Sequence, residues 1–283
     1  INKEAGHAFL VNPTAEVKNL FAKEIEMPED FSIRVYRIST SAPQMLPFKF
    51  GGDFNIIDKE YRLFGNSVYF TKYDSNSVEA DYSSNHYITF LTHEAFHYFM
   101  QSNWTVSGRF DTSVLTEKDL DLMEEEYEVL EKIYKALENG NKDELMSLTS
   151  DYVSAVKQRI EQNPEYMQEE LQAETNEGTA TYVGLNASRM VGYDYKIMHF
   201  NASSVGGEVV EWPFDTVVPM IKNGECSKDA IATDLVYQTG SLLCELLDAL
   251  EVPDWQERLN EQTSQLPVTL YSLLAEYLLD GGM

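Results

Sequence analysis

The chain has 283 residues, enough for about two domains of ordinary size or one large one. Its 21 Lys and Arg against 47 Asp and Glu leave a formal charge of −26, which argues against nucleic acid and anionic membrane surfaces as partners. A hydrophobic content of 43% excludes wholesale disorder, and no apolar run approaches the roughly 18 residues of an integral membrane segment.

The N-terminal third of the chain predicts one helix followed by a small sheet. Val17, Leu20 and Phe21 have helical spacing within residues 15–26. Later segments alternate apolar and polar residues or are rich in β-branched and aromatic ones, which is typical of strands. The expected strands are residues 31–38, 48–57 and 67–73.

After about residue 85 the pattern changes to helix. Apolar residues recur at steps of three and four, and Thr116 followed by early acids predicts an N-terminal cap. Breaks at Gly, Asn and Pro separate the helical segments. The expected helices are residues 86–101, 120–137, 144–162, 165–188, 234–250 and 270–279.

Two cysteines, Cys226 and Cys244, are too few for a disulfide framework. They form either one bridge or two thiols, and the apolar surroundings of Cys244 favour a packed thiol. The chain begins at Ile1 without a basic segment followed by an apolar one, which we interpret as a processed product. Together with the acidity, this start favours a secreted or cell-surface location.

His93, Glu94 and His97 form an H-E-x-x-H motif inside the first expected helix. One helical turn takes 3.6 residues, so His93 and His97 project from the same face and can bind one Zn²⁺ at about 2.0–2.1 Å. Glu94 lies beside such a metal and can deprotonate a bound water whose pKa zinc lowers toward about 7. The motif therefore predicts a zinc site that needs a third ligand.

A second motif follows on the expected helix 165–188, where residues 176–182 read N-E-G-T-A-T-Y. N-E-G-x-A-x-Y after H-E-x-x-H resembles the gluzincin zinc metallopeptidases, especially the aminopeptidase N branch. The resemblance implies that Glu177 is the third metal ligand; alone, Glu177 would be an ordinary exposed carboxylate. Gly178 and Ala180 would then be small because this helix packs closely against the metal-binding helix.

Tyr237 begins the segment Tyr-Gln-Thr-Gly, which is similar to a tyrosine-x-x-glycine segment of the same branch. The resemblance implies that its hydroxyl stabilises the oxyanion of the tetrahedral intermediate, worth about 2–4 kcal/mol. A core or helix-surface tyrosine is the alternative. Other donors remain open at this point, namely His199, Tyr193, Tyr195 or Tyr182.

Glu174 lies three residues before Glu177, on the same face of the expected helix. Three interpretations stay open for it: it orients a metal-binding histidine, it is an acid near the substrate, or it is solvated. Residues 68–72 lie where related proteins place an edge strand that pairs with an extended peptide, although a plain sheet strand fits equally well.

The chain also departs from the family pattern. His97 and Glu177 are separated by 79 residues, which implies an inserted helical hairpin beside the cleft. Gly184 stands where many relatives have an acid, and the G-x-M-E-N segment that binds a free substrate amine is absent. Exopeptidase activity therefore does not carry over, and the resemblance covers about residues 86–103 and 170–250.

From motifs and pattern together we expect an α+β, zincin-like fold that forms one catalytic unit. A small N-terminal sheet lobe with the metal helix takes residues 1–103, a mainly helical lobe takes residues 104–283, and the cleft lies between them. The expected activity is zinc-dependent hydrolysis of peptide or protein substrates. The alternative is a catalytically silent binding or surface-interaction module, although retention of Glu94 speaks against it.

Overall fold

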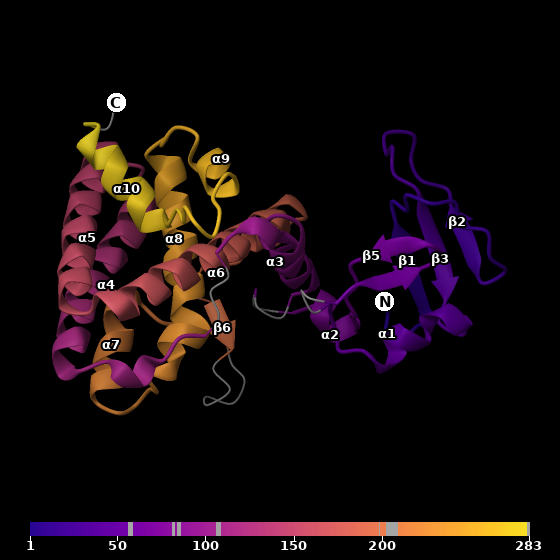
Figure 1. The fold of residues 1–283 in the computed structure, drawn as a ribbon, viewed down its shortest axis with the longest axis horizontal. Helices are drawn as coiled ribbons and strands as arrows, with labels where there is room; N and C mark the ends of the chain where they lie inside the picture. Colours follow the sequence, from indigo (N-terminus) through magenta and orange to yellow (C-terminus); the bar gives the residue numbers. More distant parts are fainter. Residues whose placement is uncertain are drawn as a thin grey trace. The chain divides into compact units, whose positions relative to one another are not determined.

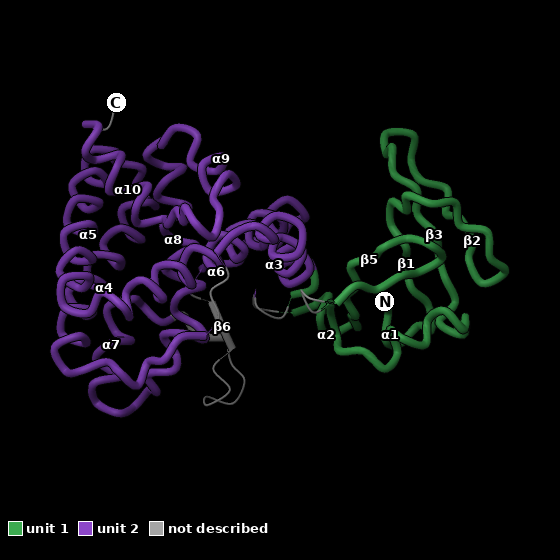
Figure 2. The backbone as a smooth tube through the Cα atoms, in the orientation of Figure 1, with its two compact units in different colours: residues 1–81, 85–87 green, residues 82–84, 88–283 purple. Residues whose placement is uncertain are grey.

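The computed structural model describes residues 1–55, 59–80, 83, 86–105, 109–197, 199–201 and 209–281, with the backbone alone for 199–201 and 209–211. The chain forms two compact units, residues 1–81 with 85–87 (unit 1) and residues 82–84 with 88–283 (unit 2), coloured separately in Figure 2. Small sheets in unit 1 and many helices in unit 2 confirm a mixed α+β chain. The division falls before Ile88 instead of after residue 103, so the H-E-x-x-H helix belongs to the helical unit.

Unit 1 is built on an antiparallel sheet with strand order β1-β3-β2. The central strand buries Ile38 completely and alternates with the exposed Arg37, as the period-two pattern requires. A tight turn through Phe64 and Gly65, both with positive φ, closes a separate hairpin of β4 and β5. The elements are β1 (His7–Val11), β2 (Ala22–Ile25), β3 (Val35–Ser39), α1 (Leu46–Phe50), β4 (Tyr61–Leu63), β5 (Asn66–Val68) and α2 (Ser75–Val78).

Two N-terminal predictions are wrong. The expected helix at 15–26 contains β2, because pairing with β3 outweighs a short helical spacing whose Leu20 is fully exposed. The expected strand at 48–57 begins instead inside α1, where Pro47 favours a helix start and Phe48 enters the core. Residues 56–58 of that segment lie outside the described residues.

The other two expected strands form only in part. The segment 31–38 gives β3, which begins at Val35. Within 67–73, the strand β5 ends at Val68, and Thr71 makes a single antiparallel bridge with Phe54. The pairing of this segment with a peptide stays a prediction.

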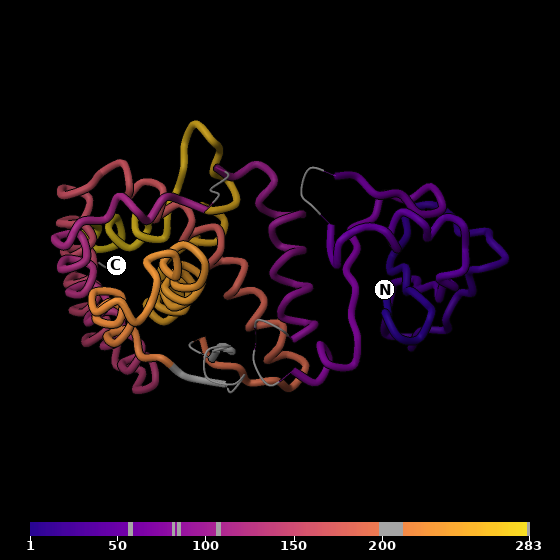
Figure 3. The backbone as a smooth tube through the Cα atoms, turned by 90° about the horizontal axis from the view of Figure 1, so that it is seen from below, coloured from indigo at the N-terminus to yellow at the C-terminus, as the bar shows by residue number. Residues whose placement is uncertain are grey.

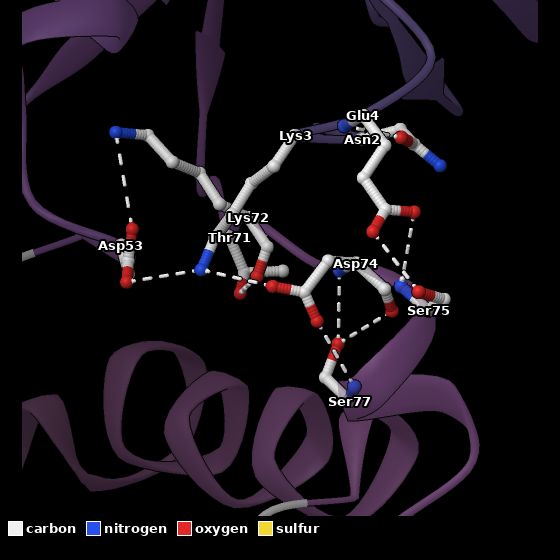
Figure 4. Close-up of polar contacts among 9 residues, drawn as sticks. All are labelled: Asn2, Lys3, Glu4, Asp53, Thr71, Lys72, Asp74, Ser75 and Ser77. Carbon is white, nitrogen blue, oxygen red and sulfur yellow. Dashed lines mark hydrogen bonds and ion pairs between the residues drawn. The ribbon is translucent and has the colours of Figure 1, made fainter.

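Polar contacts tie the first residues of unit 1 to two loops (Figure 4). The ammonium group of Lys3 lies 3.3 Å from a carboxylate oxygen of Asp53 and 3.5 Å from one of Asp74. Asp74 also caps α2 by accepting a hydrogen bond from the Ser77 amide. These contacts hold the beginning of the chain against the residues that precede α2.

Unit 2 consists of packed helices, several of which match the expected segments closely. A capping box of Thr116 and Asp119 starts α4, as predicted, and Gly140 in the left-handed conformation ends it. The elements are α3 (Tyr87–Phe99), α4 (Glu117–Asn139), α5 (Lys142–Gln162), α6 (Pro164–Met190), β6 (His199–Asn201), β7 (Val209–Glu211), α7 (Phe214–Lys222), α8 (Val236–Ala249), α9 (Trp255–Asn260) and α10 (Leu270–Leu279).

The helices of unit 2 enclose one large apolar core. Figure 1 shows α4 and α5 side by side, in agreement with their many close backbone approaches. The core includes the fully buried Leu130, Leu243 and Leu274, which come from α4, α8 and α10. Cys244 is buried in this core and Cys226 is half-buried at its edge; both are free thiols, so the bridged alternative is wrong.

The helices α6 and α8 touch through their backbones. A Cβ atom placed on Gly178 would lie 2.3 Å from the Gly240 Cα, and one on Gly240 would lie 2.1 Å from the Glu174 carbonyl oxygen. Only glycine fits at this crossing. The expected reason for the small Gly178 is corrected, because its close neighbour is α8 instead of the metal-binding helix. In the described part of the chain, no helix combines the length and the apolar character needed to cross a membrane.

Candidate metal centre

Helix α3 lies antiparallel to the C-terminal half of α6, and the two helices contact each other turn by turn. Thr89 Oγ1 lies 2.5 Å from Ser188 Oγ, and a Cβ on Gly184 would lie 2.8 Å from the Thr89 carbonyl oxygen. Two turns later, His97 of α3 meets Glu177 of α6. Figure 3 follows these helices from below. The close approach of the Thr89 carbonyl oxygen leaves no room for a side chain at position 184.

Three side chains converge at this contact. The Nε2 atoms of His93 and His97 are 3.0 Å apart, and Glu177 Oε2 lies 3.3 Å from the first and 3.1 Å from the second. In a tetrahedral zinc site with bonds of about 2.0–2.1 Å, ligand atoms are separated by about 3.3–3.4 Å. The three atoms therefore have nearly the spacing that one zinc ion requires, and the described residues contain this single group of possible metal ligands.

Gln101 fixes which nitrogen of His97 is free to bind a metal. The Gln101 amide nitrogen donates to the Asn176 carbonyl oxygen and to Thr179 Oγ1, both at 2.9 Å. A carbonyl oxygen can only accept, so the other end of the amide, Oε1, faces His97 Nδ1 at 2.6 Å. His97 Nδ1 must then carry the proton, which leaves the Nε2 lone pair directed at His93 and Glu177. This donor set fits a divalent cation.

The same contacts shift the pKa values of the groups at the centre. Burial raises the pKa of Glu177, but its contacts with His93 and His97 lower it more, to about 2, so the carboxylate is ionised. Burial lowers the pKa of His97, but the hydrogen bond to Glu177 and its charge raise it overall. Burial also raises the pKa of Glu94, against the opposing effect of the two histidines.

Tyr237 lies against the same centre. Its ring stacks on the His93 ring at a centroid distance of 5.7 Å and an interplanar angle of 14°. Burial and the nearby Glu177, with which its hydroxyl is hydrogen-bonded, raise the pKa of Tyr237. The tyrosine is the second residue of α8 and follows a π-helical segment, Ile231–Leu235, a kind of distortion that is frequent at functional sites.

A hollow of about 320 Å³ opens beside the centre. His93, Glu94 and Tyr237 line it, so the base and the phenol face the same space as one metal ligand. Thr181 of α6 and Asp234 of the π-helical segment lie on its wall. The volume is sufficient for one or two residues of a peptide.

Glu174 lies away from the histidines. Its side chain is 5% exposed and is hydrogen-bonded with Thr239 of α8, so the solvated interpretation is wrong. Burial and the charge of Glu126 raise its pKa to about 8. Glu174 belongs with the buried polar side chains of α6. Among the described contacts it has no histidine partner, and it does not line the hollow beside the metal centre.

The other tyrosines considered as oxyanion donors have partners away from the metal centre. The Tyr182 hydroxyl donates to a carboxylate oxygen of Asp248. Tyr193 and Tyr195 stack on each other at 5.8 Å in the segment after α6. The side chain of His199 lies outside the described residues.

All the expected site residues belong to unit 2, so the expected arrangement of a metal helix in one lobe and Glu177 and Tyr237 in the other is corrected. The two histidines, Glu177, Glu94 and Tyr237 come together. The sequence interpretation missed Gln101, although its position four residues after His97, on the same helical face, is a usable signal.

Comparison of the chain with family models, with curated proteins and with solved structures found no match in any of the three.

Proposed function

We propose that the protein is a zinc-dependent metallopeptidase of the gluzincin kind, with Zn²⁺ held by His93, His97 and Glu177. The observation that carries the proposal is the triangle of two Nε2 atoms and one carboxylate oxygen with sides of 3.0–3.3 Å, built by the two motifs of the resemblance. A bound Zn²⁺ supplies a Lewis acid for the scissile carbonyl group and lowers the pKa of water near it.

Glu94 is the general base of this proposal. It follows the first ligand, lines the hollow, and has a pKa raised by burial, so it accepts a proton more readily than an exposed carboxylate does. It takes the proton from the attacking water and delivers it to the leaving nitrogen. A metal site without hydrolysis has no need for a base at this position.

Tyr237 is the oxyanion donor. Its hydroxyl already lies at Glu177, and its raised pKa keeps the proton on the phenol across the neutral range. A phenol directed at developing negative charge contributes about 2–4 kcal/mol to the transition state. Stacking on His93 limits the positions that the ring can take.

The substrate proposed is a peptide or protein. The charge of −26 favours the approach of basic substrates at low salt, which is a bias on encounter and not a specificity. The competing function is a metal-binding interaction module without catalysis. A hydrolase of non-peptide amides would use the same residues.

Glu94→Gln tests the proposal. With zinc content measured alongside hydrolysis of a denatured protein and a peptide library, we expect the variant to keep one zinc and to lose hydrolysis by about 10²–10⁴-fold. Glu128→Gln, at an exposed position of α4, serves as the control and keeps full activity. Equal hydrolysis by Glu94→Gln, or none by the zinc-loaded wild type, would refute the peptidase.

A further inference from the structure

The hollow beside the metal centre has an uneven wall. Phe90 of α3 and Ile197 contribute apolar surface to it. Among the described residues the acids on the wall are Glu94, the proposed base, and Asp234, and no lysine or arginine lines the hollow. The hollow therefore combines apolar surface with one negative charge, that of Asp234, which the proposed chemistry does not use.

Asp234 is distinguished from the many other exposed acids of the chain by its position. It precedes Tyr237 by three residues, about one helical turn, and the Tyr237 ring stacks on the ligand His93. One of its carboxylate oxygens, Oδ2, accepts a hydrogen bond from Thr233 Oγ1 at 2.6 Å. The other oxygen has no hydrogen bond or ion pair within the described part of the chain, so a ligand in the hollow can reach it.

Gln238 adds a second polar group to the same wall. It follows Asp234 by four residues, on the same face, and is 8% exposed. Its side-chain amide makes no hydrogen bond with another described residue, and yet it is not enclosed by protein atoms, so it opens on the hollow. Because buried polar groups are almost always hydrogen-bonded, an amide in this position indicates a ligand, and its oxygen can accept from a cation.

We propose that this hollow selects a Lys or Arg side chain of the substrate next to the scissile bond, with Asp234 as the residue that determines the specificity. The proposal rests on the peptidase function. The aliphatic stem of such a side chain packs on Phe90 and Ile197, and its charged end binds Asp234 and Gln238. The overall charge of −26 attracts cations to the whole protein, whereas Asp234 acts at one position of the peptide.

Three pools of pentapeptide amides with the same randomised, uncharged outer positions test the subsite. The first is N-acetylated with lysine at the centre, the second is N-acetylated with norleucine there, and the third has norleucine and a free N-terminal amine. Norleucine keeps the stem of lysine without its charge, and the third pool shows whether an N-terminus supplies the cation. Zinc-loaded Glu94→Gln protein is equilibrated with mixtures of the pools at about 0.15 M salt, which screens exposed charges beyond about 8 Å. Mass spectrometry counts the retained peptides, so binding is measured without turnover.

We expect the lysine pool to be retained about fivefold more than the acetylated norleucine pool. Adding Asp234→Asn should reduce this ratio to about one, whereas Asp151→Asn, the same change at an exposed position of α5, should leave it unchanged. A ratio near one in the parent protein, a ratio that survives Asp234→Asn or falls equally in Asp151→Asn, or retention of the free-amine pool in place of the lysine pool overturns the subsite. Failure of the peptidase itself shows separately, as wild-type zinc protein that cleaves none of the three pools.

Discussion

Two clusters of charged side chains lie on the same helix, α6, about two turns apart, and they differ in what surrounds them. Glu170 is buried and accepts hydrogen bonds from the two terminal guanidinium nitrogens of Arg159, at 2.7 and 2.9 Å, while Arg159 also donates to Glu126 at 2.6 Å. Glu177 is 23% exposed and is held by two imidazoles beside an open hollow.

The two clusters differ in whether their polar atoms are all paired within the protein. In the Glu126–Arg159–Glu170 cluster every side chain is less than 9% exposed, and the guanidinium protons are shared among carboxylates. At the metal centre two imidazole nitrogens and one carboxylate oxygen converge, and an open hollow lies beside them. The first cluster is typical of a structural core, and the second is typical of a site that binds a cation and a ligand.

The largest expected effect comes from removing the cation of the buried Glu126–Arg159–Glu170 cluster. Arg159→Met leaves Glu126 and Glu170 buried without their cation, which should reduce the free energy of unfolding by about 3–5 kcal/mol. Urea unfolding measures it. Arg258→Met, which removes an exposed pair with Glu276, should cost at most about 1 kcal/mol. Equal losses of unfolding free energy in the two variants would mean that Arg159 does not neutralise two buried carboxylates.

The next effect concerns the open site. Gln101→Leu removes the acceptor that fixes the proton on His97 Nδ1, so zinc affinity should fall by about 10–100-fold. Competition with a chromophoric chelator measures it. Gln158→Leu, at an exposed position of α5, is the matched control and should bind zinc like the wild type. Unchanged affinity in Gln101→Leu would show that Gln101 does not orient the ligand.

A further effect distinguishes the two clusters by pH. Glu174 lies between them, and its pKa of about 8 in the folded protein exceeds the ordinary value of 4.5 because of burial and the charge of Glu126. A raised pKa means that the stability from Glu174 is complete below about pH 4.5 and is lost as the pH rises through 8. The loss in that window is at most about 1.4 kcal/mol per pH unit.

Glu174→Gln should therefore unfold like the metal-free wild type at pH 5 and be more stable than it at pH 8. Urea unfolding of metal-free protein at both values tests this, with the exposed Glu161→Gln as the control. A constant difference between Glu174→Gln and wild type across the range would mean that Glu174 is ionised in the fold.

The sequence predicted what depends on local spacing. The helix at 270–279 matches α10 at both ends, and the i, i+4 spacing of His93 and His97 brings their Nε2 atoms together. What failed depends on tertiary contacts. Glu174 was expected near Glu177, but α6 is buried on several faces, so a residue one turn away meets Thr239 instead.

Two helices and one helix crossing were not predicted from the sequence. The short helices α7 and α9 have too few residues for a periodic signal, and α7 contains Pro219. The crossing of α6 and α8 at Gly178 and Gly240 places Tyr237 by the metal centre, yet two glycines 62 positions apart in sequence give no pattern that pairs them.

The location of a bound zinc ion tests the central claim most directly. Crystals of zinc-loaded protein, measured at energies just above and below the zinc absorption edge, give the ion's position from anomalous scattering alone. We expect one strong site about 2.0–2.2 Å from His93 Nε2, His97 Nε2 and a Glu177 carboxylate oxygen. A zinc ion bound elsewhere, with these three side chains uncoordinated, would contradict the account.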